Sequence, residues 1–595
     1  AVPHRDPAGR SRPRQRALPL PLTSADLGPP ASKGAAPRHG EEQGVHLSRR
    51  QLLTAVPATA VGFGMRRWSR PAGGLPKRLV VADVGSVPLD EQLMLCCLQG
   101  LANRPGPRLY LEGIRSAQDF AVDATAAGWL ADAVGLPTTR VQPADLLEMF
   151  RSVIRGLVVW DPTLPYDTQN VATTMCGLSG TLPVSPARAD ELTKSPHRLR
   201  VVADLRRQRF TSGSQAYRWA LASMGPPSRF GILAWTGWPR NGNPVQPGLR
   251  DWIVARRGFA FDGSPTGNGE PFAAGNSDDN GLFVEQLLSS FPPDTAVFGY
   301  PFVDDSFYRA SGQASGEPFG VGEISHHGDY LVPSLDCTNL TVHSSFAAPR
   351  QHPPWDDHSR KPDPALTYVT FLLSDGDSLG YNEHGLRTRH WSDPARGTIP
   401  MGISISPWLA VYAPRLYRYY VQGLRSSEVL VAGPSGAGYA YPSLLPDLDG
   451  YLRRTRQLMD LSGLRAVWIL DNGYAASPPP WVTARYAAIL RPSAIFADYG
   501  GWAVPNPPAI SISGDVPVIH AAWGPDVDST VLRVRLAAAA AASRPAFVTV
   551  GLTTWTMGYS QAGAVMAALG PGYRAVRPDE LIGLVRGSGI VLEVS

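Results

Sequence analysis

The chain has 595 residues, which is room for three or four domains of about 100–200 residues each, and 43% of them are hydrophobic, as in a globular protein. The net charge of +5 is uneven, because residues 1–76 hold twelve Lys or Arg and four Asp or Glu, so the remainder carries −3. A mildly acidic body argues against nucleic acid as a partner. The fifteen tryptophans suit flat sugar faces, although tryptophan also fills ordinary cores.

Residues 1–76 are predicted to contain a targeting signal rather than a folded domain. Residues 1–47 are rich in Pro, Gly, Ala and Arg without apolar periodicity, which predicts a disordered basic tail. The run SRRQLLTAVPATAVGFGM (48–65) places two arginines directly before a short apolar stretch. This pattern predicts a twin-arginine export signal over 48–76 and an extracellular or cell-surface protein. The apolar stretch is too short to span a bilayer, so we expect no membrane span in the mature chain.

From Lys77 onward, strand-like and helix-like runs alternate. They predict α/β modules over 77–145, 146–230 and 231–347, followed by a Pro-rich linker over 348–365. Within them, PARADELTKSPHRLRVVADLRRQ (186–208) is interpreted as one Arg-rich helix, and DWIVARRGFAFDG (251–263) as a strand-like run.

The four cysteines do not form a metal or redox motif, because no C-x-x-C occurs. Cys96 and Cys97 are adjacent in an apolar helical run and are expected in the core. Cys176 and Cys337 could pair in an oxidising compartment, which the sequence does not decide.

Residues 366–595 show eight apolar strand-like runs with helix-like stretches between many of them. This predicts a catalytic domain built as a variant (β/α)₈ TIM-like barrel, with an open doubly wound sheet as the alternative. The runs are TYVTFLLS (367–374), MGISIS (401–406), VLVAG (429–433), RAVWIL (465–470), AIFA (494–497), PVIHAA (517–522), FVTVGL (547–552) and YRAV (573–576).

Polar residues follow these runs, and in a parallel barrel the carboxyl ends of the strands meet at one mouth. Glycoside hydrolysis commonly needs two carboxyl groups, one protonated acid and one nucleophile or base. Of the four glutamates in residues 366–595, Glu428 enters a strand at the wrong end and Glu593 lies near the terminus, which leaves Glu383 and Glu580. The predicted catalytic candidates are Asp375, Asp377, Asp471, Asp498 and Glu580.

The preferred hypothesis pairs Asp375 or Asp377 with Asp471. Asp375 and Asp377 are two residues apart, and charges so close raise one pKa, which a general acid requires. Asp375 could instead cap the turn through backbone N–H groups. The residues expected to bind substrate are Gly436, Gly438, Tyr439, Tyr441, Trp502, His520, Trp523 and Trp555.

The run GPSGAGYAYP (433–442) places two tyrosines on a glycine-rich turn after the third strand. Gly436 and Gly438 would let the backbone turn tightly or approach a ligand closely. We expect Tyr439 and Tyr441 to lie over the mouth and offer ring faces and hydroxyls to a sugar. The alternative is a turn whose tyrosines pack on neighbouring helices.

GAGYAYP (436–442) resembles the motif after which the GxGYxYP family is named, a group resembling glycoside hydrolases. SDGDS (374–378), QGLANR (99–104), NLTV (339–342) and the order of modules are similar as well, so the resemblance covers about 77–590. It implies small N-terminal modules ahead of a barrel-like catalytic domain and an activity on carbohydrate. It supplies no catalytic pair.

The sequence therefore predicts an exported glycoside hydrolase acting on an oligo- or polysaccharide, with no cofactor and no metal. One alternative is a metal-dependent carbohydrate deacetylase, although His384 and His390 are six apart and do not form its H-x-x-x-H pair. A second alternative is a glycan-binding surface protein without catalysis. No phosphate-binding GxxxxGK[ST] motif occurs, which argues against a nucleotide enzyme.

Overall fold

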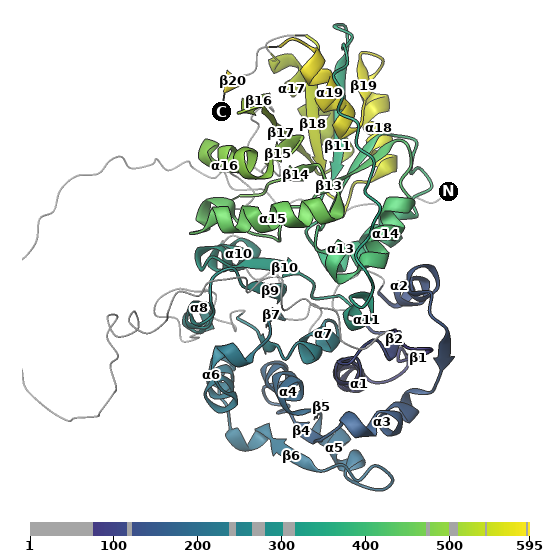
Figure 1. The fold of residues 1–595 in the computed structure, drawn as a ribbon, viewed down its shortest axis with the longest axis vertical. Helices are drawn as coiled ribbons and strands as arrows, with labels where there is room; N and C mark the ends of the chain where they lie inside the picture. The colour runs from purple at the N-terminus through teal and green to yellow at the C-terminus, as the bar shows by residue number, and fades with distance from the viewer. Residues whose placement is uncertain are drawn as a thin grey trace, which may run out of the picture. The chain divides into compact units, whose positions relative to one another are not determined.

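The computed structural model describes most of the chain beyond the predicted export signal. The described residues are 75–115, 122–236, 246–263, 280–301, 316–471, 477–498, 510–541, 544–590 and 593–594. Within them the strands form three small parallel sheets and one large sheet, surrounded by helices (Figure 1). The predicted basic tail and export signal lie outside the described residues.

The first module is a three-stranded parallel sheet in the order β2-β1-β3. Its helix α1 is buried on nearly all sides, which fits its continuous apolar run. The predicted core position of Cys96 and Cys97 is confirmed, since both are buried. The elements are β1 (Leu79–Asp83), α1 (Leu89–Ala102), β2 (Leu109–Glu112), α2 (Val122–Trp129) and β3 (Thr138–Arg140).

The second module is a parallel sheet in the order β5-β4-β6. The predicted Arg-rich helix over 186–208 is wrong, because α5 ends at Leu192 and β6 follows; Pro196 lies between them, and proline does not continue a helix. The elements are β4 (Gly156–Val159), α4 (Pro165–Ser179), β5 (Thr181–Val184), α5 (Pro186–Leu192), β6 (Val201–Asp204) and α6 (Gly213–Met224).

The third module is a parallel sheet in the order β10-β9-β7-β8. The strand-like run over 251–263 is in fact helix α7 followed by β8. Cys176 and Cys337 are both free and buried, so they do not pair. The elements are β7 (Leu233–Trp235), α7 (Arg250–Ala255), β8 (Phe259–Phe261), α8 (Asn280–Ser290), β9 (Ala296–Gly299), α10 (Gly316–His326), β10 (Tyr330–Pro333) and α11 (Leu340–His343).

The C-terminal region contains a closed barrel of seven parallel strands among its described residues. The order is β11-β12-β13-β14-β15-β17-β18, and it closes because β18 pairs with β11. Closure excludes the open-sheet alternative. The strands are β11 (Thr367–Leu373), β12 (Met401–Ile405), β13 (Glu428–Ala432), β14 (Ala466–Trp468), β15 (Ala494–Ala497), β17 (Val516–Gly524) and β18 (Ala546–Leu552).

The predicted (β/α)₈ barrel is corrected by the eighth run, which forms β19 (Tyr573–Ala575). This strand pairs only with Thr367–Val369, the first half of β11. The second half of β11 pairs with β12 through Leu372 and Leu373. β19 is therefore a short strand paired with the amino end of β11, and it does not form an eighth strand of the barrel wall. Two further strands, β16 (Ile510–Ser513) and β20 (Glu593–Val594), extend the sheet outside β17.

Helices follow the barrel strands and cover them. β11 is buried along its whole length, as expected for a parallel strand covered on both faces. Asp447 caps α15 by accepting a 2.9 Å hydrogen bond from the Gly450 amide. The helices are α12 (Leu379–Glu383), α13 (Leu409–Tyr412), α14 (Pro414–Gln422), α15 (Leu448–Ser462), α16 (Pro480–Leu490), α17 (Val527–Ala540), α18 (Tyr559–Leu569) and α19 (Pro578–Gly587).

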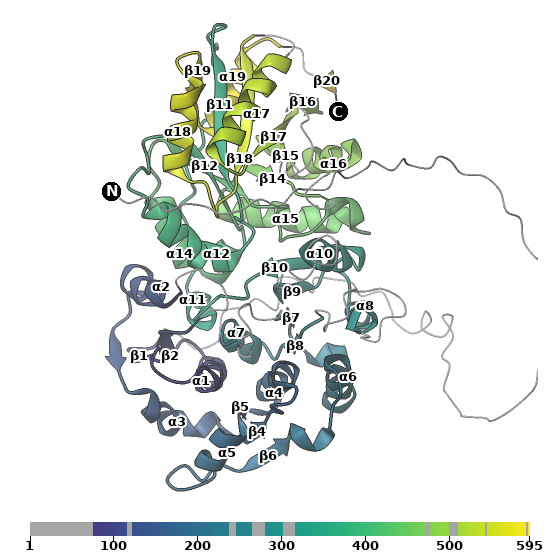
Figure 2. The same ribbon diagram turned by 180° about the vertical axis from the view of Figure 1, so that it is seen from behind.

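The third module lies directly against the barrel. Figures 1 and 2 both show β10 and α10 next to α15, and Arg454 of α15 forms an ion pair with Asp294. The indole of Trp129 in the first module donates a 2.7 Å hydrogen bond to the Glu383 carbonyl. The predicted linker packs along α19, where the Arg360 amide donates to the Gly583 carbonyl at 2.9 Å.

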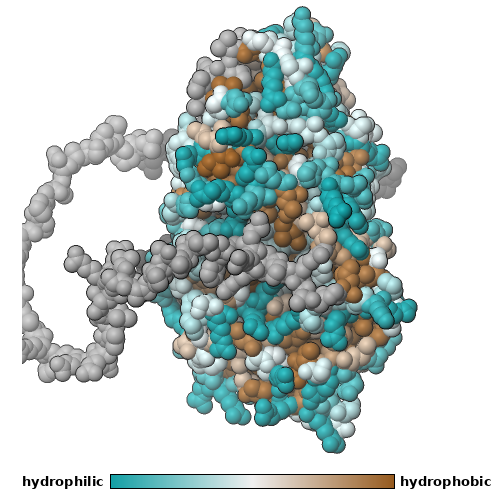
Figure 3. All heavy atoms as spheres, viewed as in Figure 1, coloured by the Kyte–Doolittle hydropathy of each residue, from teal (hydrophilic) through white to brown (hydrophobic). Residues whose placement is uncertain are grey.

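The surface is mixed in character. On the face shown in Figure 3, small groups of hydrophobic residues lie between hydrophilic ones, as on ordinary globular domains. None of the helices in the described ranges is both long enough and apolar enough to cross a bilayer.

Candidate active site

An acidic turn, Ser374–Ser378, follows β11 at the carboxyl end of the barrel. Its Asp375 adopts a left-handed conformation with φ 62° and accepts hydrogen bonds from the Ser374 and Thr554 hydroxyls, the latter at 2.6 Å. The Gly376 amide donates to Ser404 Oγ at 2.9 Å, and a Cβ on Gly376 would lie 2.1 Å from the Ser404 carbonyl carbon. The turn is thus clamped between β12 and the segment after β18, which is why it needs glycine at its centre.

Asp377 has the electrostatic setting of a general acid. Burial raises the pKa of its carboxyl well above the usual range, and the negative charges of Asp375 and Glu317 raise it further. Burial also raises the pKa of Asp375, although the two hydroxyl donors oppose this. As whole residues, Asp375 and Asp377 are only partly buried. A carboxyl that keeps its proton can donate it to a bound substrate.

An exposed indole lies beside the acidic turn. Trp555 follows Thr554 directly and is 44% exposed, and its ring meets the buried Tyr381 edge-on with centroids 6.1 Å apart. Arg389 lies over the same indole at 5.3 Å. Trp555 is therefore held in a fixed orientation with one part of its ring open to a ligand, as a sugar platform requires.

The glycine-rich loop after β13 binds the third module. Tyr439 and Leu331 of β10 exchange backbone hydrogen bonds of 2.7 and 2.9 Å. Gly438 has φ +145°, and a Cβ there would lie 2.5 Å from the Leu331 carbonyl oxygen. The Tyr439 hydroxyl donates to Glu317 Oε1 at 2.8 Å, and the Tyr441 amide donates to Ser325 Oγ at 2.9 Å. The loop joins the barrel to both α10 and β10.

The predicted position of the two tyrosine rings over the mouth is corrected. Tyr439 is 3% exposed and Tyr441 2%, and their rings pack edge to face with centroids 5.8 Å apart. Gly436 lies against the side chain of Thr455, which a Cβ would approach to 2.5 Å. The packed-turn alternative describes the loop better, because its glycines admit protein neighbours and its rings are covered.

Asp471 supports the end of this loop. It is 1% exposed, and its Oδ1 accepts hydrogen bonds from the Ser443 amide at 3.0 Å and the Ser443 hydroxyl at 2.9 Å. Ser435, near the start of the loop, donates to the Leu470 carbonyl at 2.8 Å. The catalytic role predicted for Asp471 stays a prediction, and its described contacts are those of a loop anchor.

A second polar pair joins β15 and β17, with Asp498 directly after β15 and His520 within β17. Asp498, with φ 68°, has its Oδ2 2.7 Å from His520 Nδ1 and accepts a 3.0 Å hydrogen bond from Ser477. Both the Asp498 and His520 side chains are partly exposed. Trp523 is 5% exposed and lies in the core, whereas Trp502 falls outside the described residues.

The remaining candidate, Glu580, lies away from the mouth. Its Oε2 accepts from the Arg577 amide at 3.1 Å, closing the first turn of α19. Arg577 also donates to the carbonyl of Ser426, which precedes β13 at the amino end of the barrel. Glu428, which the sequence excludes, is buried at that same end in an ion pair with Arg396 at 2.7 Å.

The histidines of the deacetylase alternative are engaged elsewhere. His384 contacts Thr125 and lies 3.1 Å from the Asp336 carbonyl, and His390 Nε2 lies 3.2 Å from the Thr554 carbonyl. Within the described ranges, no three His, Cys, Asp or Glu side chains are grouped as a metal site requires.

Family models match three successive regions of the chain. "GxGYxYP putative glycoside hydrolase C-terminal domain" matches residues 366–586, "GxGYxYP third domain" 233–345 and "GxGYxYP_N second domain" 154–225. The chain belongs to the GxGYxYP family. Among curated proteins, none matches.

A solved structure shares the fold of this GxGYxYP chain. It is described as a putative hydrolase from Bacteroides thetaiotaomicron VPI-5482, and it aligns with a TM-score of 0.70 over 86% of this chain and 95% of its own. The identity is 23%, so the likeness concerns the fold.

The residue that sequence reasoning missed in this GxGYxYP chain is Glu317. It lies in the first turn of α10 in the third module, far from the barrel strands in the sequence, and its hydrogen bond to Tyr439 and its charge acting on Asp377 reveal its place. Asp304 and Asp305, two further acidic residues of the same module, lie outside the described residues.

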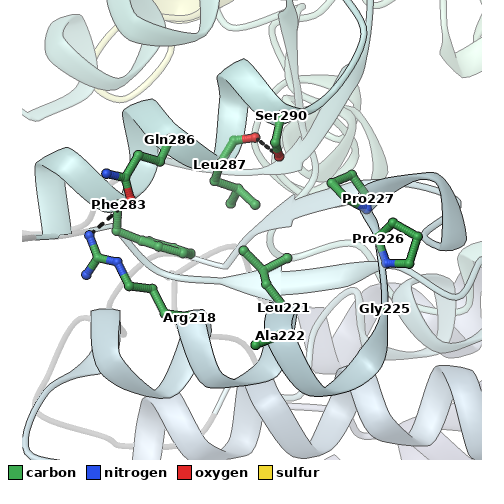
Figure 4. A pocket seen from close by; sticks show the side chains of 10 residues that line it. All are labelled: Arg218, Leu221, Ala222, Gly225, Pro226, Pro227, Phe283, Gln286, Leu287 and Ser290. Atoms are coloured by element: carbon green, nitrogen blue, oxygen red, sulfur yellow. Dashed lines mark hydrogen bonds between the residues drawn. The ribbon is translucent and has the colours of Figure 1, made fainter. Parts of the chain in front are cut away.

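A separate hollow of about 500 Å³ lies between α6 and α8 (Figure 4). Arg218 donates to Gln286 at its edge at 3.2 Å, and Leu221, Phe283 and Leu287 give it an apolar lining. Among the described residues that line this hollow there is no carboxyl group.

Proposed function

We propose that this protein hydrolyses glycosidic bonds at the carboxyl mouth of its barrel, with Asp377 as the general acid. The observation that carries the proposal is the environment of Asp377, a partly buried residue whose carboxyl pKa is raised well above its usual range, first by burial and then by the negative charges of Asp375 and Glu317. The membership of the GxGYxYP family supports the reaction class. The exposed ring of Trp555 beside the turn supports sugar as the substrate.

In this reaction the Asp377 carboxyl gives its proton to the glycosidic oxygen while the bond from that oxygen to the anomeric carbon breaks. Protonation lets the oxygen leave as an alcohol rather than an alkoxide. Asp375 contributes negative charge that keeps the proton on Asp377, and it is itself fixed by Ser374 and Thr554.

The test uses aryl glycosides whose leaving groups differ in basicity, screened over several sugars and both anomers. On 4-methylumbelliferyl glycosides, Asp377→Asn lowers kcat/KM by about 10²–10⁴-fold. On 2,4-dinitrophenyl glycosides, whose leaving group needs little protonation, the same variant stays close to the wild type. An Asp377→Asn variant with wild-type rates on both substrates contradicts the proposal.

We also propose export through the twin-arginine pathway. The support is the order of residues, Arg49 and Arg50 followed directly by the apolar run to Met65. Replacing both arginines by lysine should hold the chain in the cytoplasm when it is expressed in its host. Unchanged delivery of that variant to the medium or cell surface contradicts this part.

A further inference from the structure

We propose that Glu317 of the third module is the second catalytic carboxylate, and that Tyr439 of the glycine-rich loop is the residue that positions it. The inference rests on the proposed hydrolase function and extends it, since it assigns half of the chemistry to a segment outside the barrel.

The first support is that one loop touches both carboxylate-bearing segments. At its start, a Cβ on Gly433 would lie 2.5 Å from the Asp377 amide nitrogen, so the loop begins directly against the acidic turn. Six residues later, the Tyr439 hydroxyl reaches Glu317. The two acids are thus linked by a short stretch of closely packed chain, and the charge of Glu317 acts on Asp377.

The second support is that α10 and β10 are held at several points. Leu331 pairs with Tyr439 through both backbone bonds, and Ser325 accepts from the Tyr441 amide. Glu317, Ser325 and Leu331 belong to one helix–strand unit that is only 18 residues long. Their attachment to a single loop fixes the direction of the Glu317 side chain relative to the barrel, as a reacting group requires.

The third support is chemical complementarity. A phenol that donates to a carboxylate favours its ionised form, and Glu317 lies in the first turn of α10, where the helix dipole also favours negative charge. Burial and the neighbouring negative charges raise the pKa of Asp377, which favours its protonated form. One protonated and one ionised carboxyl are the two states that glycoside hydrolysis uses.

In the reaction, the electron pair of the broken glycosidic bond goes to the departing oxygen, which takes the Asp377 proton. Glu317 either takes a proton from the water that bonds to the anomeric carbon, or bonds to that carbon itself and is released by water in a second step. Both routes give a free sugar hydroxyl and the departing alcohol. The anomeric form of the first product, followed by NMR, distinguishes them.

The inference also explains the family motif in physical terms. Gly436 admits Thr455 and Gly438 admits the Leu331 carbonyl, so the loop can lie close to both neighbours. Tyr439 holds Glu317, and Tyr441 packs against the Tyr439 ring. The motif therefore aligns the Glu317 carboxylate of the third module with the barrel and does not itself form a sugar-binding surface.

The test compares four variants of the full chain on the best aryl glycoside of the panel. Glu317→Gln lowers kcat/KM by about 10²–10⁴-fold, whereas Glu323→Gln on the same helix leaves it unchanged. Glu317→Ala recovers part of its activity with added azide, which fills the place of the lost carboxylate. Tyr439→Phe lowers kcat/KM by about tenfold and moves the acidic limb of the pH profile to higher pH, because the ionised form of Glu317 loses a donor.

The control for the phenol is Tyr417→Phe, which removes a buried hydroxyl that donates to Ser462 at 2.6 Å, away from the mouth. Tyr417→Phe leaves the acidic limb of the pH profile of kcat/KM unchanged. A Glu317→Gln variant with wild-type activity, beside an inactive Asp377→Asn, overturns this inference alone. A Tyr439→Phe variant with an unshifted limb overturns the positioning role. A wild-type chain that cleaves no glycoside of the panel overturns the proposed function and this inference together.

Discussion

At the amino end of the barrel, Glu428 receives hydrogen bonds from Arg396 at 2.7 Å and from the Tyr559 hydroxyl at 2.6 Å, whereas at the carboxyl end Asp377 faces Asp375 and Glu317. The first arrangement neutralises a buried charge with a cation and satisfies its oxygens. The second brings acids together and raises the pKa of one of them. The contrast teaches that the two ends treat buried carboxyl groups differently, since the amino end pairs one with a cation and the carboxyl end favours the protonated form of another.

The largest expected effect is on activity at the carboxyl end. Asp377→Asn should cost about 10²–10⁴-fold in kcat/KM while leaving the free energy of unfolding equal to or above that of the wild type, because it removes a repelling acid. Steady-state kinetics and urea unfolding measure the two quantities. Asp528→Asn on the exposed start of α17 is the control. If Asp377→Asn lowered the free energy of unfolding as much as a core substitution does, the carboxyl end would also be stabilising the fold and the contrast with the amino end would be lost.

The next effect is on stability at the amino end. Glu428→Gln should lower the free energy of unfolding by about 3–5 kcal/mol, because Arg396 is then buried without its counter-charge. Urea unfolding measures it. The double variant Glu428→Gln with Arg396→Met should recover part of the loss, since no charge is left unpaired. A loss below about 1 kcal/mol in the single variant would contradict the role of the pair.

A third effect concerns the loop that joins the barrel to the third module. Gly438→Ala should cost about 1–3 kcal/mol, because its φ of +145° excludes other residues and a Cβ would meet the Leu331 carbonyl. Gly563→Ala is the matched control, since Gly563 lies in α18 with open space at its Cβ position. That control should be neutral or slightly stabilising. Equal unfolding midpoints for the two variants would show that the loop is not under this constraint.

The last expected effect is a gradual dependence of the free energy of unfolding on pH. Burial raises the pKa of Glu383 to about 8, and its carboxyl accepts from the Thr338 hydroxyl at 2.7 Å. The folded protein therefore keeps a proton that the unfolded chain releases near pH 4.5, so stability is full below that pH and falls as pH rises towards 8. The slope is at most about 1.4 kcal/mol per pH unit.

Glu383→Gln should flatten this slope between pH 5 and 8, as measured by urea unfolding at each pH. Glu323→Gln on α10 should keep it. If the slope of the free energy of unfolding against pH were unchanged in Glu383→Gln, the pH dependence would belong to other carboxyl groups. The groups at the two ends of the barrel would then be the next to compare.

The sequence predicts the strands of the barrel well, because a parallel strand covered on both faces is a continuous apolar run. It does not predict how the barrel closes. YRAV is strand-like, but whether it forms a wall depends on which part of β11 it pairs with, and that is a matter of register between distant segments. The sequence predicts a strand where helix α7 forms, because a short apolar run that is buried on all sides has no distinguishing period.

For the site, the acidic turn was predictable from its place after a buried strand. The burial of Tyr439 and Tyr441 was not, because the residues that cover them, such as Glu317, lie more than a hundred positions earlier in another module. Glycine next to tyrosine indicates a close approach, and the sequence alone does not say whether the approaching group is a ligand or a protein neighbour.

The backbone pairing of Leu331 with Tyr439 has a consequence for anyone who shortens this chain. A fragment that begins at residue 366 would retain every wall of the barrel, yet the Tyr439 amide and carbonyl would lose their partners and two aromatic rings would meet water. Such a fragment would tend to self-associate through this uncovered edge, so a gene trimmed to the barrel region is a poor source of a stable monomeric fragment.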